Sequence, residues 1–409
     1  MDKKILQKRR NDLGNQLQNN EVVIIFAQSA PAYPRYFLQD NNFLYFTDLE
    51  IPDAVFVAEK NQDKVNFSLF IDRGIPEMVV WEGAKLSPKE AAEISAIDQV
   101  HHLDEFKWNL SRTLQATKKC YLNIKVQSLD SDLKKQHKLS AEIKQKFPYI
   151  ILQDISDLII PLRNIKDKYE INCIKKAIEH TREGIISILK NAEPGMMEYE
   201  LEALLNYEIM RRGDMHLGFK PIIASGKNAA TLHYIDNNCR IGKNDLILLD
   251  VGALHKNYNA DISRTFPVAG KFTDRQAEVY EEVLKINKAI IEKVKPGISL
   301  TALNEATVEM ITASLFKLKL ISDKSEYRKY YMHSVSHHLG MDTHDVGSRV
   351  SVLEPGNVIT VEPGIYIPDE NIGVRIEDDI LVTEKGYENL SVDIPKEIDD
   401  LVAAIIKRG

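Results

Sequence analysis

The chain has 409 residues, of which 44% are hydrophobic and 28% are charged. This composition is ordinary for a globular protein, and the length exceeds what one compact core usually needs, so we expect two domains. Lys and Arg number 53 against 60 Asp and Glu, and the resulting net charge of -7 does not favour nucleic acid as a partner. No run approaches the roughly 20 apolar residues of a membrane span.

The sequence favours a cytoplasmic protein with no membrane partner. Its first residues, MDKKILQKRRNDL, mix basic side chains with Asp and lack the apolar core of a secretory signal. The three cysteines, Cys120, Cys173 and Cys239, are odd in number and lack the paired spacing of a disulfide framework or a zinc knuckle. We therefore expect a reducing compartment.

Residues 1–157 are expected to form an α/β domain. The short apolar runs EVVIIFA, DAVFVAE, NFSLFID and KCYLNIKV alternate with helical patterns such as SPKEAAEISAI and SDLKKQHKLSAEIKQKF. Near residues 154–168 a proline and a charge cluster interrupt this rhythm, and the pattern changes afterwards. We place the domain boundary here, which makes residues 158–409 the second domain.

The second domain contains a loose internal repeat. Isoleucines at helical spacing predict a long helix that ends before Pro194, and a second helix follows from about Met197 to about Arg212. The same order of helix, Pro-Gly, helix and strands recurs around Pro296. Each copy leads into two strand candidates, DLILLDVGAL with YNADISRTFPV, and NVITVEPGIYI with GVRIEDDILV. The fold class is therefore α/β (α+β), and two related halves would face a shared cleft.

Four carboxylates interrupt the apolar strand candidates of this repeat: Asp250, Asp261, Glu362 and Glu377. A carboxylate is costly to bury unless a positive charge compensates it. Any one of them alone would be expected at an exposed strand end, but four in matched positions of two repeated units indicate a cation site. Four exceed what one ion normally needs from a protein, and carboxylates can bridge, so two metals that share ligands are the economical arrangement.

Histidines supply a further candidate element. Four of the 11 histidines fall within the 12 residues 333–344, namely His333, His337, His338 and His344. A lone histidine is usually a core or surface residue, but this density is hard to obtain from packing needs. A zinc site made by these histidines alone is the competing interpretation, although it leaves the four carboxylates unexplained.

Four segments of the second domain resemble the metallopeptidases of the pita-bread fold, which include methionine aminopeptidase, prolidase and aminopeptidase P. They are LLDVGALHKNYNADISRTFPV, HSVSHHLGMDTHDVG, VITVEPGIYIP and GVRIEDDILVTEKG, in the family's order over roughly residues 160–400. The segment YPRYFLQDNNFLYFTDLEIPDAVFV is similar to the N-terminal domain of aminopeptidase P and many prolidases, which methionine aminopeptidases lack. The resemblance implies an aminopeptidase P-type N-terminal domain, followed by a catalytic pita-bread domain with a pseudo-twofold internal repeat.

The resemblance also implies a set of metal ligands: Asp250, Asp261, His337, Glu362 and Glu377. Asp261 and Glu377 would bridge the two ions. His337 is chosen over His338 because it keeps the family's spacing from His333. Adjacent residues of an extended segment point to opposite sides, so His337 and His338 do not easily serve one site.

Other residues are implied near the substrate. His233 and His344 match two histidines that the family places there, while His333 matches a third that lines the proline pocket, with Tyr366 beside it. Arg375 and Glu377 share a strand face by two-residue alternation, so we expect Arg375 to hydrogen-bond this bridging carboxylate.

The implied chemistry is hydrolysis of the bond between an N-terminal residue and a proline in the second position of a peptide. A hydroxide shared by two divalent ions is available near neutral pH. Glu362 would handle the proton of the water, while His233 or His344 would donate to the oxyanion and help protonate the leaving nitrogen. One His with four carboxylates is a hard ligand set that favours Mn²⁺, with Co²⁺, Fe²⁺ and Zn²⁺ as alternatives.

Three other functions stay open. A prolidase would use the same centre but cut only dipeptides. A non-catalytic pita-bread scaffold that binds peptides, and a creatinase-like hydrolase that works without metal, are both disfavoured by the complete set of ligands.

Trp81, in VVWEG, is one of only two tryptophans. On its own it would be expected in the core. However, its segment resembles the part of the aminopeptidase P N-terminal domain that reaches the substrate cleft of a neighbouring subunit. We therefore expect a homodimer or homotetramer in which Trp81 helps to bind substrate.

Overall fold

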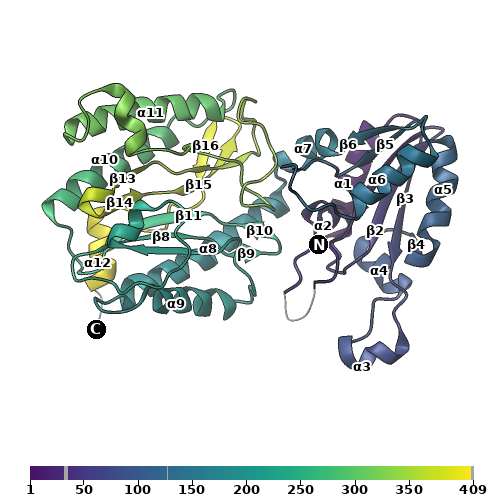
Figure 1. Ribbon diagram of the computed structural model, residues 1–409, viewed down its shortest axis with the longest axis horizontal. Helices are drawn as coiled ribbons and strands as arrows, with labels where there is room; N and C mark the ends of the chain where they lie inside the picture. Colours follow the sequence, from purple (N-terminus) through teal and green to yellow (C-terminus); the bar gives the residue numbers. More distant parts are fainter. Residues whose placement is uncertain (32–35, 127, 407–409) are drawn as a thin grey trace. The chain divides into compact units, whose positions relative to one another are not determined.

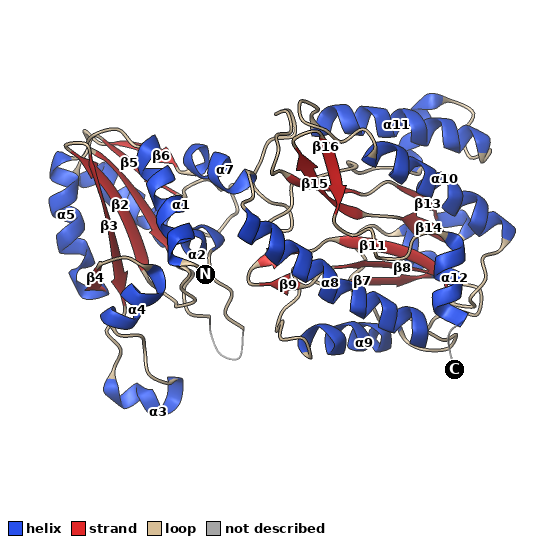
Figure 2. Ribbon diagram, turned by 180° about the vertical axis from the view of Figure 1, so that it is seen from behind, coloured by secondary structure: helices blue, strands red, loops and turns tan. Residues whose placement is uncertain are grey.

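The computed structural model describes residues 1–31, 36–126 and 128–406, which form two compact units, Met1–Leu162 and Arg163–Gly409 (Figure 1). Both units mix helices and strands (Figure 2), so the expected α/β (α+β) class is confirmed. Residues 33–35, which begin the segment similar to the aminopeptidase P N-terminal domain, lie outside the described residues. None of the described helices is long and apolar enough to cross a membrane.

The first unit is built on one mixed sheet. Its strands are β1 (Glu21–Phe26), β2 (Val55–Asn61), β3 (Lys64–Ile71), β4 (Gln99–His102), β5 (Lys119–Leu122) and β6 (Ile151–Asp154), in the order β4-β3-β2-β1-β5-β6. Its helices are α1 (Lys3–Gln16), α2 (Asn41–Thr47), α3 (Val79–Glu82), α4 (Pro88–Ser95), α5 (Phe106–Ala116), α6 (Lys135–Lys146) and α7 (Ser156–Asn164), which runs across the division between the units. The strands β1, β2 and β3 pair antiparallel, while β4, β5 and β6 join in parallel.

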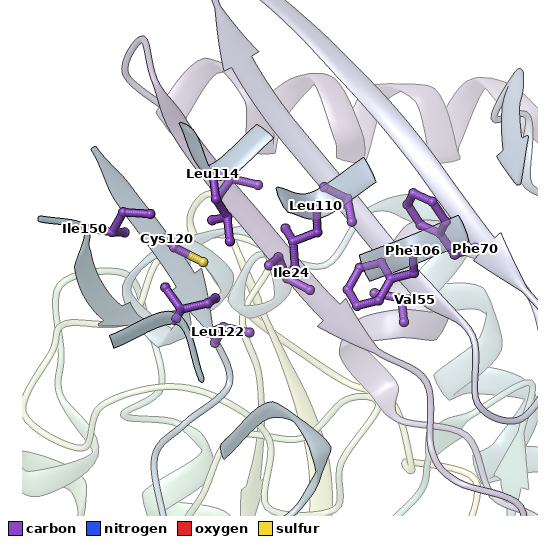
Figure 3. Packing of buried hydrophobic residues seen from close by; sticks show 12 residues of the cluster. Ile24, Val55, Phe70, Phe106, Leu110, Leu114, Cys120, Leu122 and Ile150 are labelled. Atoms are coloured by element: carbon purple, nitrogen blue, oxygen red, sulfur yellow. The ribbon is translucent and has the colours of Figure 1, made fainter. Parts of the chain in front are cut away.

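The central strand β1 is buried almost along its whole length because helices cover both of its faces. On one face, Phe106, Leu110 and Leu114 recur at helical spacing along α5. They pack with apolar side chains of the strands, such as Ile24 and Val55, in the cluster that Figure 3 shows. The apolar runs of the sequence thus correctly predicted this sheet.

Two pairs of long helices dominate the second unit. The first pair is α8 (Lys168–Asn191) with α9 (Glu198–Met210), and the second is α10 (Asp274–Ile291) with α11 (Leu300–Lys317). A shorter helix, α12 (Ile398–Ile406), follows near the C-terminus. The first helix begins with a capping box, because Asp167 accepts the N–H of Glu170 and the Glu170 carboxylate accepts the N–H of Asp167. It ends before Pro194, as predicted.

Short antiparallel strands lie between these helix pairs (Figure 2). They are β7 (Ile222–Ser225), β8 (Leu246–Val251), β9 (Leu254–His255), β10 (Tyr258–Asn259), β11 (Ile262–Pro267), β12 (Val358–Val361), β13 (Gly364–Ile367), β14 (Ile372–Arg375), β15 (Asp378–Thr383) and β16 (Gly386–Asn389). They form the sheets β11-β8-β7, β12-β15-β16, β13-β14 and β10-β9. The predicted repeat is confirmed, because α8, α9 and the β11-β8-β7 sheet are followed by α10, α11 and the β12-β15-β16 sheet.

Polar contacts join the two halves of this unit. The backbone N–H of Glu377 donates to the carbonyl of Ser263 on β11, and the Thr265 hydroxyl donates to the carbonyl of Arg375 on β14. The buried side-chain amide of Asn287, on α10, donates to the carbonyls of Val361 and Ile376. These bonds fix the backbone next to two of the four strand carboxylates, Glu362 and Glu377.

Candidate metal centre

A cavity of about 240 Å³ lies among the strands of the second unit. Its titratable lining residues are His233, Asp250, Asp261, His333, His337, His344, Arg349, Glu362, Arg375 and Glu377. The structure therefore brings together all four strand carboxylates and four of the predicted site histidines. Each half of the repeat contributes two of the carboxylates.

The carboxylates reach the cavity from strand ends and from the turns between strands. Asp250 is the second-last residue of β8, where it pairs with Ser263 of β11. Asp261 lies between β10 and β11, Glu362 directly follows β12, and Glu377 lies between β14 and β15. The apolar runs before Asp250 and Glu362 are buried, which is why the sequence pointed to these two, while Asp261 and Glu377 were marked by their matching places in the other strand candidates.

Asp261 and Glu377 are buried, with 5% and 2% of their surface exposed. Burial, together with the charge of Asp250, raises the pKa of Asp261 well above its ordinary value. Burial and the charge of Asp261 do the same to the pKa of Glu377. Burial also raises the pKa of Glu362 to about 7. These carboxylates repel one another in a desolvated site, so their ionised forms need a compensating cation.

His337 faces this carboxylate cluster with its Nε2 atom. Its Nδ1 lies 3.0 Å from the carbonyl oxygen of His338 and donates to it, which fixes the orientation of the ring. That Nε2 lies 3.4 Å from Asp261 Oδ2 and 3.7 Å from Glu362 Oε1. The ligand atoms of Asp261, His337 and Glu377 lie within 4.8 Å of one another, close enough to hold a metal ion.

His338 takes no part in this cluster. It is 5% exposed, and its ring packs against Gly347, where a Cβ atom would come within 2.2 Å of the ring. Burial lowers the pKa of His338 to about 4, so the ring is neutral near pH 7. The two metal-binding groups found among the described residues contain only one histidine of the 333–344 segment, His337. The competing zinc site made by these histidines alone is therefore not assembled in the described structure.

Arg375 is bound differently from the expectation. Its Nη2 donates to Asp250 Oδ2 at 2.6 Å, its Nη1 to the Tyr366 hydroxyl at 3.0 Å and its Nε to the Ser263 hydroxyl at 2.8 Å. The Ser263 hydroxyl in turn donates to Glu377 Oε2 at 2.8 Å. The predicted direct bond between Arg375 and Glu377 is thus corrected, because Ser263 stands between the two side chains.

Asp250 also retains binding capacity that the protein does not use. Its Oδ1 atom is buried and has no hydrogen-bond partner among the described residues. A buried carboxylate oxygen without a partner is uncommon, and within this donor set it fits a metal ligand.

The remaining histidines surround the cluster. His333 Nδ1 donates to the carbonyl of Ser334, and its Nε2 accepts from the Tyr366 hydroxyl at 2.9 Å. Burial and the charge of Arg375 lower the pKa of His333 to about 4, so the ring is neutral near pH 7. His233 and His344 are exposed, and the His344 ring centroid lies 4.2 Å from that of His337. Burial and the neighbouring His337 lower the pKa of His344.

Two buried groups that sequence reasoning missed hold the segments that carry His233 and His344. Glu198, fully buried on α9, accepts from the Tyr234 hydroxyl at 2.6 Å and from the backbone of Cys239 at 2.9 Å. Asp345 accepts from Arg163 at 2.6 Å and from Lys166 at 2.9 Å. Nothing in the sequence marked Glu198 or Asp345, because their partners lie far away along the chain.

Trp81 is not a core residue. It lies on α3 in the first unit and is 81% exposed, next to Val80, which is 89% exposed. The expectation from its residue type alone is therefore wrong. Its proposed contact with substrate involves another subunit and stays a prediction.

Comparison with known proteins agrees with this site. Residues 172–384 match the model of metallopeptidase family M24, and residues 6–121 match that of the aminopeptidase P N-terminal domain. The chain therefore belongs to metallopeptidase family M24, a family of hydrolases. Within it, the resemblance to aminopeptidase P is confirmed, with a mixed N-terminal domain followed by a pita-bread domain.

The similarity extends over nearly the whole of this chain and over most of the length of the relatives. The Xaa-Pro aminopeptidase of Escherichia coli (strain K12) is 33% identical, with 98% of each chain covered. Xaa-Pro aminopeptidase 3 of Homo sapiens is 33% identical over 97% of this chain and 83% of its own length. Among solved structures, a putative aminopeptidase P from Bacillus anthracis matches with a TM-score of 0.97 and 40% identity, covering 100% of this chain and 99% of the other.

The raised pKa of Glu362 predicts a pH-dependent stability in the absence of metal. The folded state holds this proton up to about pH 7, against an ordinary value of 4.5. The contribution of Glu362 to stability is therefore complete below pH 4.5 and is lost as the pH rises through about 7. Glu362→Gln cannot ionise, so the melting temperature of the metal-free variant should rise relative to that of the metal-free wild type across this range.

The lowered pKa values of His333 and His338 make stability rise with pH, in the opposite direction to Glu362. Both histidines are present in the wild type and in the variant, so the difference in melting temperature between these two proteins isolates the effect of Glu362. Differential scanning calorimetry at pH values from about 4 to about 8 measures it. A difference that stays constant, or shrinks as the pH rises, contradicts the assigned electrostatics.

Proposed function

We propose that this chain is a metal-dependent aminopeptidase that hydrolyses the bond between an N-terminal residue and a following proline. The observation that carries the proposal is the single cavity that gathers four carboxylates with the Nε2 atom of His337. The relatives matched along the whole chain are named Xaa-Pro aminopeptidases. A structure of the E. coli aminopeptidase P with the inhibitor Pro-Leu matches with a TM-score of 0.92 and 32% identity.

Five residues are proposed as ligands of two divalent ions: Asp250, Asp261, His337, Glu362 and Glu377. Asp261 and Glu377 are the proposed bridging ligands, because they are the most deeply buried and the charges around them raise both of their pKa values. When bound, such ions supply a water of lowered pKa and polarise the scissile carbonyl. The hard, oxygen-rich set favours Mn²⁺. One solved structure of the E. coli aminopeptidase P is a zinc-substituted form, which supports Zn²⁺ as an alternative. Co²⁺ and Fe²⁺ are further alternatives for this ligand set.

The other residues act on the substrate and its protons. Glu362, whose carboxylate lines the cavity beside His337, accepts the proton of the attacking water. The exposed His233 and His344 donate to the oxyanion of the substrate and to the leaving proline nitrogen. His333 is proposed to present its neutral ring to the proline. Tyr366, expected beside it in the pocket, is fully buried and does not line the cavity, so it acts on His333 from behind through its hydroxyl.

Arg375 positions the centre rather than the substrate. Its three bonds to Asp250, Tyr366 and Ser263 engage every nitrogen of the guanidinium. A prolidase needs a cation to capture the carboxylate of a dipeptide, and Arg375 is not free for this role. The other arginine of the cavity, Arg349, is exposed and donates to the Ser334 hydroxyl. The engagement of Arg375 favours longer peptides over a preference for dipeptides, whereas Arg349 is the arginine that a dipeptide carboxylate would have to use.

The N-terminal unit is proposed to mediate assembly into a homodimer or homotetramer, in which Trp81 contacts substrate bound to a neighbouring subunit. The exposed apolar side chains of α3 support this role. Light scattering should show a species larger than 46.6 kDa, whereas a monomer at assay concentration contradicts this assembly.

We also propose a cytoplasmic location, because the three cysteines are free. Fractionation that finds the protein outside the cytoplasm contradicts this location.

Substrate length and metal dependence test the proposed activity. Protein stripped of metal should be inactive, and Mn²⁺ should restore cleavage of Ala-Pro-Ala at least as efficiently as that of Ala-Pro. Ala-Ala-Ala should be cleaved poorly, because the proposed activity requires proline in the second position. Chromatographic detection of the released alanine measures all three rates.

A matched pair of variants controls for nonspecific effects. Glu377→Gln should lose nearly all activity. Glu388 lies on strand β16, away from the cavity, and its exposed carboxylate pairs with Lys175 of α8. Glu388→Gln should therefore retain activity. Hydrolysis confined to dipeptides would reassign the chain to prolidase, and full activity in protein shown to be metal-free would refute the metal mechanism.

A further inference from the structure

A second group of metal-ligand side chains lies outside the candidate centre, within the same unit. It consists of His180, Asp214 and His255, whose ligand atoms all lie within 4.8 Å of one another. None of the three lines the cavity of the candidate centre.

Both histidines of this group converge on one carboxylate. His180 Nδ1 lies 2.5 Å from Asp214 Oδ2, and His255 Nδ1 lies 2.8 Å from Asp214 Oδ1. The two rings stand edge to face with their centroids 5.5 Å apart. Two imidazoles and one carboxylate are the three protein ligands of many zinc sites that keep a fourth position for water.

Three separate segments supply the group. His180 lies in the middle of α8, Asp214 follows α9, and His255 ends β9. A tight turn with positive φ at Lys256 and Asn257 follows and leads into β10. His255 therefore lies beside the turn of the hairpin, and β10 leads through Ala260 to Asp261 of the candidate centre.

Hydrogen bonds that do not involve the group hold these segments in place. The Thr181 hydroxyl, next to His180 on α8, accepts the N–H of Ala253 at 2.9 Å in the core. The carbonyl of His216 accepts the N–H of Leu254, and Leu217 forms a β-bridge with Ala253. The backbone thus presents the three side chains to one point before any ion binds, which lowers the entropic cost of binding one.

Burial at this point is uneven. The side chains of His180 and Asp214 are 4% and 6% exposed, whereas that of His255 is 21% exposed. The buried His180 and Asp214 would separate a bound ion from solvent on one side. On the side of His255 the ion would be accessible to solvent. This opening provides both a path for the ion and room for a water ligand.

We propose that His180, Asp214 and His255 bind a third divalent ion, Zn²⁺, that stabilises the β9-β10 hairpin. Ligand atoms of tetrahedral zinc lie roughly 3.3 Å apart, given bonds of about 2.0–2.1 Å. The distances of 2.5 Å and 2.8 Å therefore need to widen by less than about 1 Å when zinc replaces the protons between the ligands. The partly exposed hairpin can supply this movement. The proposal does not depend on the peptidase activity.

The test is the number of zinc ions that the protein retains. Metal-free protein is equilibrated with Zn²⁺, separated from free ions by gel filtration and analysed by elemental analysis. The wild type should retain three ions per chain, and His255→Gln should retain two. Asp261→Asn should lose ions of the candidate centre but keep the third, which separates failure of one site from failure of the other.

Two further measurements distinguish a metal ligand from a purely structural hydrogen-bonded group. Co²⁺ in place of zinc should give the intense visible absorption of a tetrahedral site in the wild type, and His255→Gln should lose it. The same variant should keep most of its Mn²⁺-supported peptidase activity. His101→Gln, which changes a partly exposed histidine of the N-terminal sheet, is the matched control and should bind as the wild type does.

Two results would overturn the proposal. Equal numbers of retained ions in the wild type and in His255→Gln, whatever the candidate centre holds, would show that the group does not bind zinc. Retention of three ions by His255→Gln would place the third ion elsewhere.

Discussion

The mutual repulsion of four carboxylates in one small cavity is the constraint on which the rest of the catalytic unit depends. Fully ionised, Asp250, Asp261, Glu362 and Glu377 carry four negative charges, and Arg375 offsets one of them through Asp250. The neighbouring His333 is neutral near pH 7, so it offsets none. Two divalent ions held by these carboxylates would supply four positive charges, enough to offset the three negative charges that remain. The same balance explains why the carboxyl pKa values rise so far when no ion is present.

The repeated fold provides the scaffold that such a cluster requires. Each half delivers two carboxylates from short antiparallel strands, and buried polar groups fix the backbone beside them. Asn287 ties the strand ends next to Glu362 and Glu377, while Ser263 links Arg375 to Glu377. A site that concentrates charge in this way stores electrostatic free energy, which the packing of the two helix pairs must offset.

Much of this arrangement could be predicted from the sequence, because its signals are local. Apolar runs that end in a carboxylate marked Asp250 and Glu362, and the Pro-Gly punctuation marked the repeat. The spacing of the histidine segment correctly separated His337, in the cavity, from the buried His338. Contacts between distant segments could not be predicted in this way. The partner of Arg375 lies 125 residues away, and Ser263 between Arg375 and Glu377 has no signature of its own. The exposure of Trp81 and the convergence of His180, Asp214 and His255 likewise arise only in the folded chain.

Anomalous diffraction at the manganese absorption edge, from crystals of the Mn²⁺-loaded protein, tests the central claim most directly. The account predicts two peaks about 3.5–4 Å apart between Asp261 and Glu377, as in other two-metal sites. His337 Nε2 should contact one of them, and His338 should contact neither. A single peak, or two peaks that lie away from these carboxylates, would contradict the proposal that paired cations neutralise this cluster.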